Sequence, residues 1–472
     1  MHKKLLSSSA LLLYILILGL FLRLYRYTNE SIWLDEAVSI YLALQPLSFI
    51  LTYSDPTPPL FYILLHLWAY LGTSPAVLKL LTVIISTATI PAVYLVAQKI
   101  YNKKVALYAA LFCAVSPLHV FYAQELRAYA LLFLVSTFAI YYYLCFNESR
   151  NAKVLYVVFF IMTVYTHVYG IFVLLAIHLH SFHAKYYKNI SSYLKSTWLK
   201  IHLALSITLI PFLYMVWVAS QRDEVTWVTL PKLIDFQVFA LQLIVGPTFF
   251  AVSGLLIFFA AMLIIKNIHE QYSSSQKSKH HLIYYLLAIP VVVPLILSYL
   301  YQPIFFPRHA LLISIPLYIY LAWGMHKMPY RKIITAIYVA AAIFIVILQA
   351  HSTIKVPVPH TEVSPPVAFY PYAFSFAYIF ETAPECFRLN PESVVYECAA
   401  NQQIYGLYEQ EYVLSHETAF IILTDFAHPH EIIERYTDFE NYTQEIYYTN
   451  TDVGIFRNYA RYPHAALVHL TE

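Results

Sequence analysis

Glycine and charged residues are both scarce in this chain of 472 residues. The sequence has only 8 Gly, and no two of them lie within seven residues of each other. A GxGxxG fingerprint or a GxxxxGK[ST] loop therefore cannot occur, which excludes Walker-type ATPases and the Gly-rich Rossmann cofactor sites. Charged residues make up 12% of the chain, against about a quarter in ordinary globular proteins. This composition argues against a soluble protein.

Apolar residues take the place of the missing charge. They form 60% of the chain, which includes 44 Tyr and 31 Phe. Runs of about 18 or more apolar residues can cross a bilayer as helices. We expect eleven such spans, centred near residues 15, 88, 112, 137, 161, 176, 210, 252, 291, 318 and 342. The segment 58–72 is apolar but short, and we interpret it as re-entrant, interfacial or half of a paired crossing.

The distribution of Lys and Arg gives the orientation. One set of loops carries 17 of these cations, and the alternate loops and span edges carry 7. Cytoplasmic loops are the ones enriched in Lys and Arg. We therefore predict a multi-pass protein of the cell membrane with a cytoplasmic N-terminus, and an odd number of spans places the C-terminal part outside.

The charge balance changes sharply near residue 355. Residues 1–355 hold 25 Lys and Arg against 10 Asp and Glu, whereas residues 356–472 hold 4 against 16. A Pro-rich segment, 356–366, joins the two parts and is typical of a linker. We predict a transmembrane domain over residues 1–355, with its first outer loop over residues 25–75, and a small extracytoplasmic α/β domain of unknown role over residues 356–472.

The C-terminal part shows a mixed pattern of expected elements. We expect strands at Ala419–Leu423, Glu445–Tyr448 and Val453–Phe456, and a short helix at His430–Phe439. The four cysteines of the chain are too few for a disulfide scaffold. Cys386 and Cys398 both lie in the part expected outside, where a disulfide can persist, and their spacing permits a bridge without demanding one.

Acidic and basic residues occur together on the outward loops. Some of them lie at the edges of apolar runs, where placing an ionised side chain in the membrane costs free energy. The cost is about 3 kcal/mol at mid-membrane and less toward the interface, so such residues usually pair with each other or line a water-filled cavity. The outer face is therefore the expected working face. Its candidate residues are Asp35, Glu36, Asp55, Gln124, Glu125, Arg127, His167, Tyr169, Arg308 and His309.

A plain structural explanation competes for each of these residues. Asp35 and Glu36 suit the solvated first turn of an interfacial helix running to Leu51. Glu125 and Arg127 suit a structural ion pair. His167 suits a packed core histidine, and Arg308 suits an orientation charge near a helix start.

Five motifs in this order carry a family resemblance. They read Trp33-Leu34-Asp35-Glu36-Ala37, then Asp55-Pro56-Thr57-Pro58-Pro59-Leu60-Phe61-Tyr62, then Ser116-Pro117 with Tyr122-Ala123-Gln124-Glu125-Leu126-Arg127-Ala128-Tyr129-Ala130-Leu131, then Tyr165-Thr166-His167-Val168-Tyr169-Gly170, and finally Pro307-Arg308-His309. Over residues 1–350 the chain resembles GT-C glycosyltransferases that use polyprenyl-phosphate sugars, and among them the prokaryotic relatives of protein O-mannosyltransferases and of the lipid A aminoarabinose transferase. Thr57 stands where that family usually has His, and His309 where it usually has Tyr.

The resemblance implies an all-α, GT-C-like membrane fold and an inverting sugar transfer on the outer face. The donor would be a polyprenyl-phosphate-linked sugar from the bilayer, and the acceptor a glycan, a lipid or a protein; no nucleic-acid partner is expected. Asp35, with Glu36, is the expected catalytic carboxylate, and Arg308 and Arg127 would bind the leaving phosphate.

The remaining candidate residues would orient the substrates. These are Asp55, Gln124, Glu125, His167, Tyr169 and His309. No cofactor is certain, and a divalent metal at Glu36 or Asp55 stays open. The rival hypothesis is a lipid or glycan flippase or transporter, which also places charges inside a membrane bundle.

Overall fold

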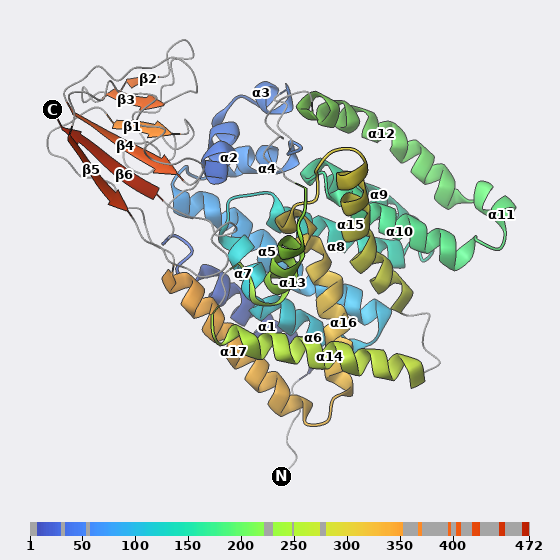
Figure 1. Cartoon of the computed structure of the whole chain (residues 1–472). Coiled ribbons are helices and arrows are strands. Elements are labelled where there is room, and N and C mark those ends of the chain that lie inside the picture. The colour runs from blue at the N-terminus through green and yellow to red at the C-terminus, as the bar shows by residue number, and fades with distance from the viewer. Residues whose placement is uncertain are drawn as a thin grey trace.

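The body of the molecule is a bundle of helices (Figure 1). The computed structural model describes residues 7–29, 34–52, 57–220, 230–247, 250–273 and 280–352, together with six strands after residue 366. The helices are α1 (Ser8–Leu24), α2 (Leu34–Leu44), α3 (Leu47–Thr52), α4 (Leu60–Ala69), α5 (Pro75–Ile100), α6 (Lys103–Val115), α7 (Pro117–Gln124), α8 (Tyr129–Leu144), α9 (Arg150–Thr166), α10 (Gly170–Lys185), α11 (Ile190–Leu194), α12 (Thr197–Ser220), α13 (Leu233–Val245), α14 (Ser253–Ser273), α15 (His281–Leu300), the 3-10 helix η3 (Pro307–Ile313), α16 (Ser314–Lys327) and α17 (Arg331–Ser352).

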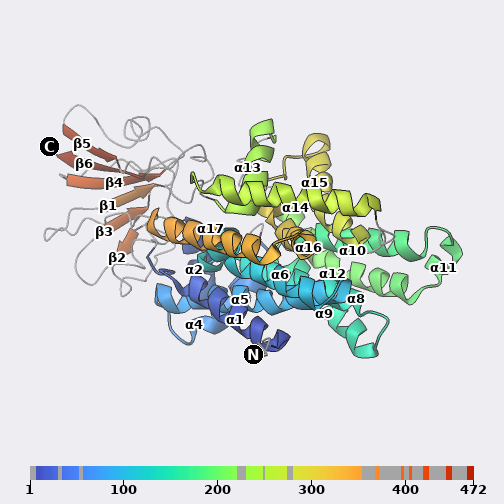
Figure 2. The ribbon, with the colours of Figure 1, turned by 90° about the horizontal axis from the view of Figure 1, so that it is seen from below.

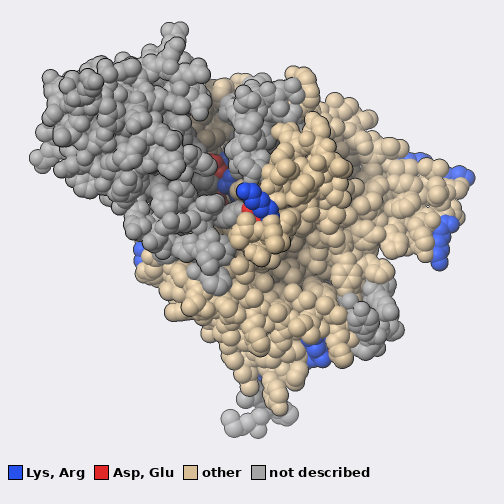
Figure 3. Space-filling model, viewed as in Figure 1, with Lys and Arg blue, Asp and Glu red and all other residues tan. Residues whose placement is uncertain are grey.

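Five of the described helices are long and apolar enough to cross a membrane, and a sixth span results if the bent pair α6 and α7 is counted as one. They are α5, α12, α14, α15 and α17. The chain is thus an all-helical, multi-pass membrane protein in this part. Figure 3 agrees with this assignment, because most of the described surface in view carries no charged residue. The predicted number of eleven spans is not confirmed.

Helices contain ten of the eleven predicted span centres. The remaining centre, near residue 252, lies in the connection between α13 and α14, one residue before α14, which is itself a candidate span. Gly246 ends α13 just before Pro247. Its φ of 81° lies in the left-handed region, which residues with a Cβ atom rarely adopt. The short apolar segment 58–72 forms α4 of 10 residues, about 15 Å long, which is half of the bilayer core.

A bend joins α6 and α7, and the end of α7 leads into the loop that carries Glu125 and Arg127. The two helices meet at 52° around Ser116, whose hydroxyl accepts a hydrogen bond from the His119 N–H. Arg23 of α1 is fully buried beside this bend. Its guanidinium donates to the carbonyl oxygens of Cys113 and Ala114, which the bend leaves without helical partners, at 3.1 and 3.0 Å. A third bond, of 2.9 Å, ends on the hydroxyl of Ser86 in α5.

Two clusters of buried apolar side chains hold the helices together. The larger one runs through the bundle, and the smaller one packs α2 and α4 against α5 and α8. Ile40, Phe61, Leu65 and Leu78 of the smaller cluster are completely buried. Figure 2 shows α2, α4 and α5 together on the blue side of the bundle. The segment that carries α2 and α4 is thereby fixed to the bundle by its own core.

The C-terminal strands form one mixed sheet in the order β2-β3-β1-β4-β6-β5. They are β1 (Val367–Tyr370), β2 (Val395–Glu397), β3 (Gln403–Gly406), β4 (Thr418–Thr424), β5 (Thr443–Tyr448) and β6 (Ala465–Thr471). β1 lies parallel to β3 and β4, and β6 lies antiparallel to β4 and β5.

The strands expected at 419–423 and 445–448 lie within β4 and β5 and are confirmed. The strand expected at 453–456, the helix expected at 430–439, Cys386 and Cys398 lie outside the described residues. The small α/β domain stays a prediction.

Replacing Arg23 by Met should destabilise the bundle. The variant leaves the carbonyls of Cys113 and Ala114 buried without their donor, at a cost of about 1–3 kcal/mol for such a group. We expect a clearly lower melting temperature in detergent, measured by size-exclusion chromatography after heating. Arg150→Met, on the exposed first turn of α9, is the control and should melt as the wild type does.

Candidate active site

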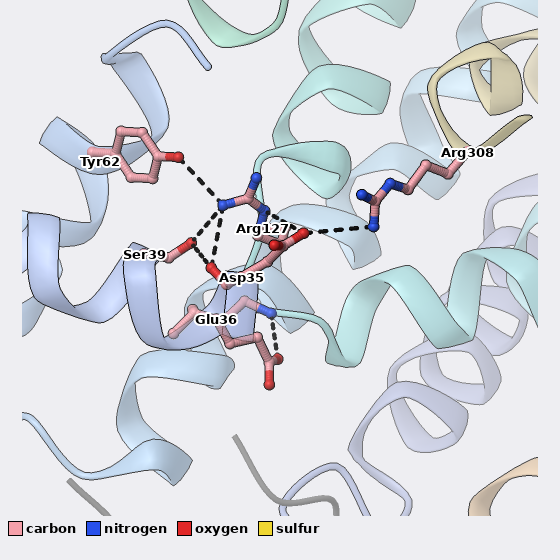
Figure 4. A network of polar contacts seen from close by, with 7 residues as sticks. Asp35, Glu36, Ser39, Tyr62, Arg127 and Arg308 are labelled. Atoms are coloured by element: carbon pink, nitrogen blue, oxygen red, sulfur yellow. Dashed lines mark hydrogen bonds and ion pairs between the residues drawn. The ribbon is translucent and has the colours of Figure 1, made fainter. Parts of the chain in front are cut away.

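Asp35 is the centre of a polar cluster formed by α2, the loop after α7 and η3 (Figure 4). It lies in the first turn of α2. Its Oδ2 is 3.5 Å from Nη1 of Arg308 and 3.9 Å from Nε of Arg127. The side chain of Asp35 is 24% exposed, so a substrate can reach it. The sequence prediction that Asp35, Arg127 and Arg308 act in one place is consistent with this geometry.

Arg127 is held by three contacts through one nitrogen. Its Nη1 donates to the carbonyl oxygen of Asp35 at 3.2 Å, to the Ser39 hydroxyl at 3.3 Å and to the Tyr62 hydroxyl at 3.4 Å. Ser39 also donates to the Asp35 carbonyl, at 2.9 Å. The guanidinium thus bridges α2, α4 and the loop after α7 (Figure 4), and its direction is fixed before any ligand binds.

Glu36 points away from Asp35 and is fully buried. Successive residues of a helix are about 100° apart, so the two neighbouring carboxylates face different surroundings. Glu36 Oε1 lies 3.1 Å from the buried Lys79 Nζ and accepts a hydrogen bond of 2.8 Å from the Leu126 N–H. The solvated first turn suggested by the sequence is wrong for Glu36. Its contacts fit a residue that fixes α2 against α5 and the 125–128 loop better than the expected catalytic role.

The same contacts bear on the expected metal. Within the described ranges, no group of three or more His, Cys, Asp or Glu side chains is placed to hold a metal ion. A lysine ammonium occupies the position beside Glu36 that a cation would take, and two guanidiniums flank Asp35. These residues do not fit a divalent metal. Asp55, the other expected ligand, lies outside the described residues.

Glu125 is buried next to this cluster, with 2% of its surface exposed. Burial, reinforced by the nearby Glu36 carboxylate, raises the pKa of Glu125 to about 8. Glu125 is therefore largely protonated at neutral pH. The cluster then holds three cations, Lys79, Arg127 and Arg308, against the two carboxylates of Asp35 and Glu36. An excess of positive charge at a partly exposed place suits an anionic ligand.

His167, Tyr169 and Gln124 bond to the protein backbone. Burial lowers the pKa of His167 to about 3, with a further contribution from Arg127 and Arg308. Its Nδ1 accepts a hydrogen bond of 3.1 Å from the Tyr169 N–H. The Tyr169 hydroxyl donates to the Ile304 carbonyl at 2.7 Å, and the Gln124 amide donates to carbonyls at the end of α1.

Arg308 comes from a part of the sequence distant from Asp35 and Arg127. It lies in η3, and its guanidinium carbon is 4.9 Å from the centre of the Phe306 ring. The following residue, His309, belongs to the same 3-10 helix, but its side chain is outside the described set. The expected contribution of His309 stays a prediction.

Sequence reasoning missed three residues of the cluster. Ser39 lies four residues after Asp35, which is one helical turn, so its place on the same face was open to inference. Lys79 stands in an otherwise apolar span, which itself signals a buried partner, but from the sequence it enters only as one of the 7 cations that give the orientation. Tyr62 had no such signal beyond its place in the Pro-Pro-Leu-Phe-Tyr motif.

Comparison with known families gives a match for part of the chain. Residues 56–217 match the family model described as dolichyl-phosphate-mannose-protein mannosyltransferase. The predicted glycosyltransferase family is thereby confirmed, and the chain carries a membrane glycosyltransferase segment of this type. The matched segment includes Lys79, Glu125, Arg127 and His167 but neither Asp35 nor Arg308. No curated protein matches the chain.

Solved structures share the fold. ArnT from Cupriavidus metallidurans matches with a TM-score of 0.59 and 10% identity in its apo state, and each chain covers 98% of the other. The same enzyme bound to undecaprenyl phosphate matches with a TM-score of 0.56 and 10% identity, again over 98% of both chains. An Archaeoglobus fulgidus oligosaccharyltransferase tethered to an acceptor peptide matches with a TM-score of 0.50 and 12% identity, over 80% of this chain. This chain spans 63% of the length of that oligosaccharyltransferase.

The raised pKa of Glu125 predicts a pH-dependent stability. Its folded value of about 8 lies above the ordinary 4.5, so the folded state retains a proton that the unfolded state has lost. The contribution of this group to stability should therefore be highest below pH 4.5 and fall as the pH rises to about 8.

Glu125→Gln, which cannot ionise, should remove this contribution. Melting curves of both proteins between pH 5 and 9 test the prediction, since other groups titrate in both. The variant should melt at a progressively higher temperature than the wild type as the pH rises. Parallel pH profiles of the two proteins would contradict it.

Proposed function

We propose that this protein is an inverting glycosyltransferase that moves a sugar from a polyprenyl phosphate to an acceptor hydroxyl on the extracytoplasmic face. The observation that carries the proposal is one partly exposed carboxylate, Asp35, held between two guanidiniums. The match of residues 56–217 to the mannosyltransferase family supports the reaction type. The undecaprenyl phosphate bound by the ArnT of similar fold supports a polyprenyl-phosphate donor.

The residues divide the reaction between them. Asp35 takes the proton of the acceptor hydroxyl as its oxygen forms a bond to the anomeric carbon. The bond between that carbon and the phosphate oxygen breaks at the same time, and its electron pair leaves with the polyprenyl phosphate. Arg308 and Arg127 stabilise this growing negative charge, since guanidinium matches phosphate geometry and retains its charge in a dry site.

Inversion is supported by the described part of the cluster, in which Asp35 is the one carboxylate available to a substrate. A retaining mechanism needs a second carboxylate as nucleophile, close to the first. The two nearest acids do not suit that role: Glu36 is buried and bonded to Lys79, and Glu125 is protonated at neutral pH. A single displacement at the anomeric carbon inverts its configuration.

The assignment of the cluster to the extracytoplasmic side rests on the distribution of Lys and Arg among the loops. The Lys-rich loops join the ends of the helices opposite Asp35, Arg127 and Arg308 in the predicted topology, and such loops stay in the cytoplasm. The cluster then faces outside, where polyprenyl-linked sugars and cell-surface acceptors meet. The acidic region 356–472 would form an extracytoplasmic domain on the same side, with the acceptor being a glycan, a lipid or a protein.

Asp35→Asn should lower the rate of transfer from a labelled lipid-linked sugar by about 10²–10⁴, the usual contribution of a positioned base. Arg308→Ala should lower it by at least about 10², because the leaving charge loses a donor. Asp235→Asn is the control for the first change, since Asp235 caps α13 by accepting from the Lys232 N–H. Full activity of both variants would refute the mechanism.

Reconstitution in liposomes separates the transferase from a flippase. The proposal predicts a glycosidic product that depends on an added acceptor, and loss of this product in Asp35→Asn. Lipid movement without product would favour the flippase instead.

A further inference from the structure

An extended segment, residues 302–306, connects α15 to η3 and carries Arg308 to the cluster. It has no regular secondary structure, so other groups must hold its backbone. Ser298, 3% exposed, accepts hydrogen bonds from the N–H groups of Ile304 and Phe305 at 3.0 and 2.7 Å. The Ser298 hydroxyl itself donates to the Pro294 carbonyl at 2.8 Å. One side chain therefore fixes the start of the segment to the end of α15.

Tyr169 holds the same segment through two further hydrogen bonds. It lies between α9 and α10 and is 3% exposed. Its hydroxyl donates to the Ile304 carbonyl at 2.7 Å and accepts from the Phe306 N–H at 3.4 Å. Its own backbone N–H is bonded to His167, so the tyrosine is oriented in turn. Both hydrogen-bonding roles of the hydroxyl are directed to backbone groups near Arg308.

Aromatic packing completes the attachment. Phe305 is 1% exposed, and its ring lies 5.4 Å from the ring of Phe236 and 6.0 Å from that of Phe239, both on α13. The next ring, Phe306, lies against the Arg308 guanidinium. The path from Tyr169 to the reactive groups is therefore short: Tyr169 bonds to Phe306, Phe306 contacts Arg308, and Arg308 pairs with Asp35.

We propose that Tyr169 and Ser298 are positioning residues that lock the 302–306 segment so that Arg308 meets the leaving phosphate. The kinetic part of this inference rests on the proposed function. Tyr169 then acts through the backbone, in place of the substrate contact expected from the sequence. Misplacing a charged group by about 1 Å is enough to cost about 10² in rate.

Tyr169→Phe and Ser298→Ala each remove one hydroxyl and leave the rest of the side chain. We expect kcat to fall about 10–100-fold at saturating lipid-linked sugar, with the KM for the donor little changed, because Arg308 acts on charge that develops in the transition state. Tyr165→Phe is the matched control for the first change. Tyr165 also donates to a distant carbonyl, that of Thr208 at 2.7 Å, but it has no bond to the segment. Ser136→Ala, at a buried hydroxyl bonded within α8, is the control for the second. Both controls should stay within about twofold of the wild type.

Combination with Arg308→Lys tests whether the effect passes through Arg308. Lysine retains the charge without the fork of the guanidinium, so activity stays measurable. Adding Tyr169→Phe to Arg308→Lys should cost clearly less than adding it to the wild type, since residues in one unit are non-additive. Full additivity of the two losses would overturn the inference.

Hydrogen–deuterium exchange measures the lock without any enzymatic reaction. Peptides covering residues 302–308 should exchange faster in Tyr169→Phe and Ser298→Ala than in the wild type, and unchanged in the two controls. Wild-type exchange in both variants would overturn the lock even if transfer is observed. Faster exchange in a protein that transfers no sugar would instead leave the lock standing and refute the proposed function.

Discussion

The contact of Asp35 with two guanidiniums is the constraint on which the site depends. It joins three parts of the chain that are distant in sequence: the start of α2, the loop after α7 and the 3-10 helix η3. Each part reaches the contact through its own support. α2 is fixed by a separate apolar core, α7 is aimed by the bend that Arg23 stabilises, and η3 is carried by the 302–306 segment. The site thus lies where three elements meet, and different contacts hold each of them in place.

In this glycine-poor chain, side chains take the place of the backbone donors that a Gly-rich loop would supply to a phosphate. Many phosphate sites use the backbone N–H groups of a Gly-rich loop. Here the donors aimed at an anion are guanidiniums on helical or hydrogen-bonded segments, and a partly exposed carboxylate lies between them. Such side-chain donors need rigid supports, because a long side chain otherwise loses conformational entropy when it binds. The three contacts of Arg127 supply that rigidity before the ligand arrives.

The sequence predicted the helices better than the details of the site. Apolar runs located most of the helices, since burial in lipid or protein requires them, but their lengths do not reveal which helices cross a bilayer. The centre expected near residue 252 was misplaced, because Gly246 ends α13 and the next helix, α14, begins at Ser253. The order of the motifs and the family resemblance predicted that Asp35, Arg127 and Arg308 act at one site. They did not distinguish Asp35 from Glu36, because the difference depends on which face α2 turns toward Lys79. The role of Tyr169 was equally hidden, because its partners are backbone groups more than a hundred residues away.

The buried pair of Glu36 and Lys79 restricts how this sequence can change over time. Removing either charge alone leaves the other buried without its ion-pair partner, at a cost of about 3–5 kcal/mol, which is a large part of the stability of a small domain. Exchange of Lys79 for Arg keeps the charge and is the easy step, whereas reversal or loss requires both positions to change together. A survey of natural variants should accordingly find these two positions linked, although they belong to different helices and neither is exposed to substrate.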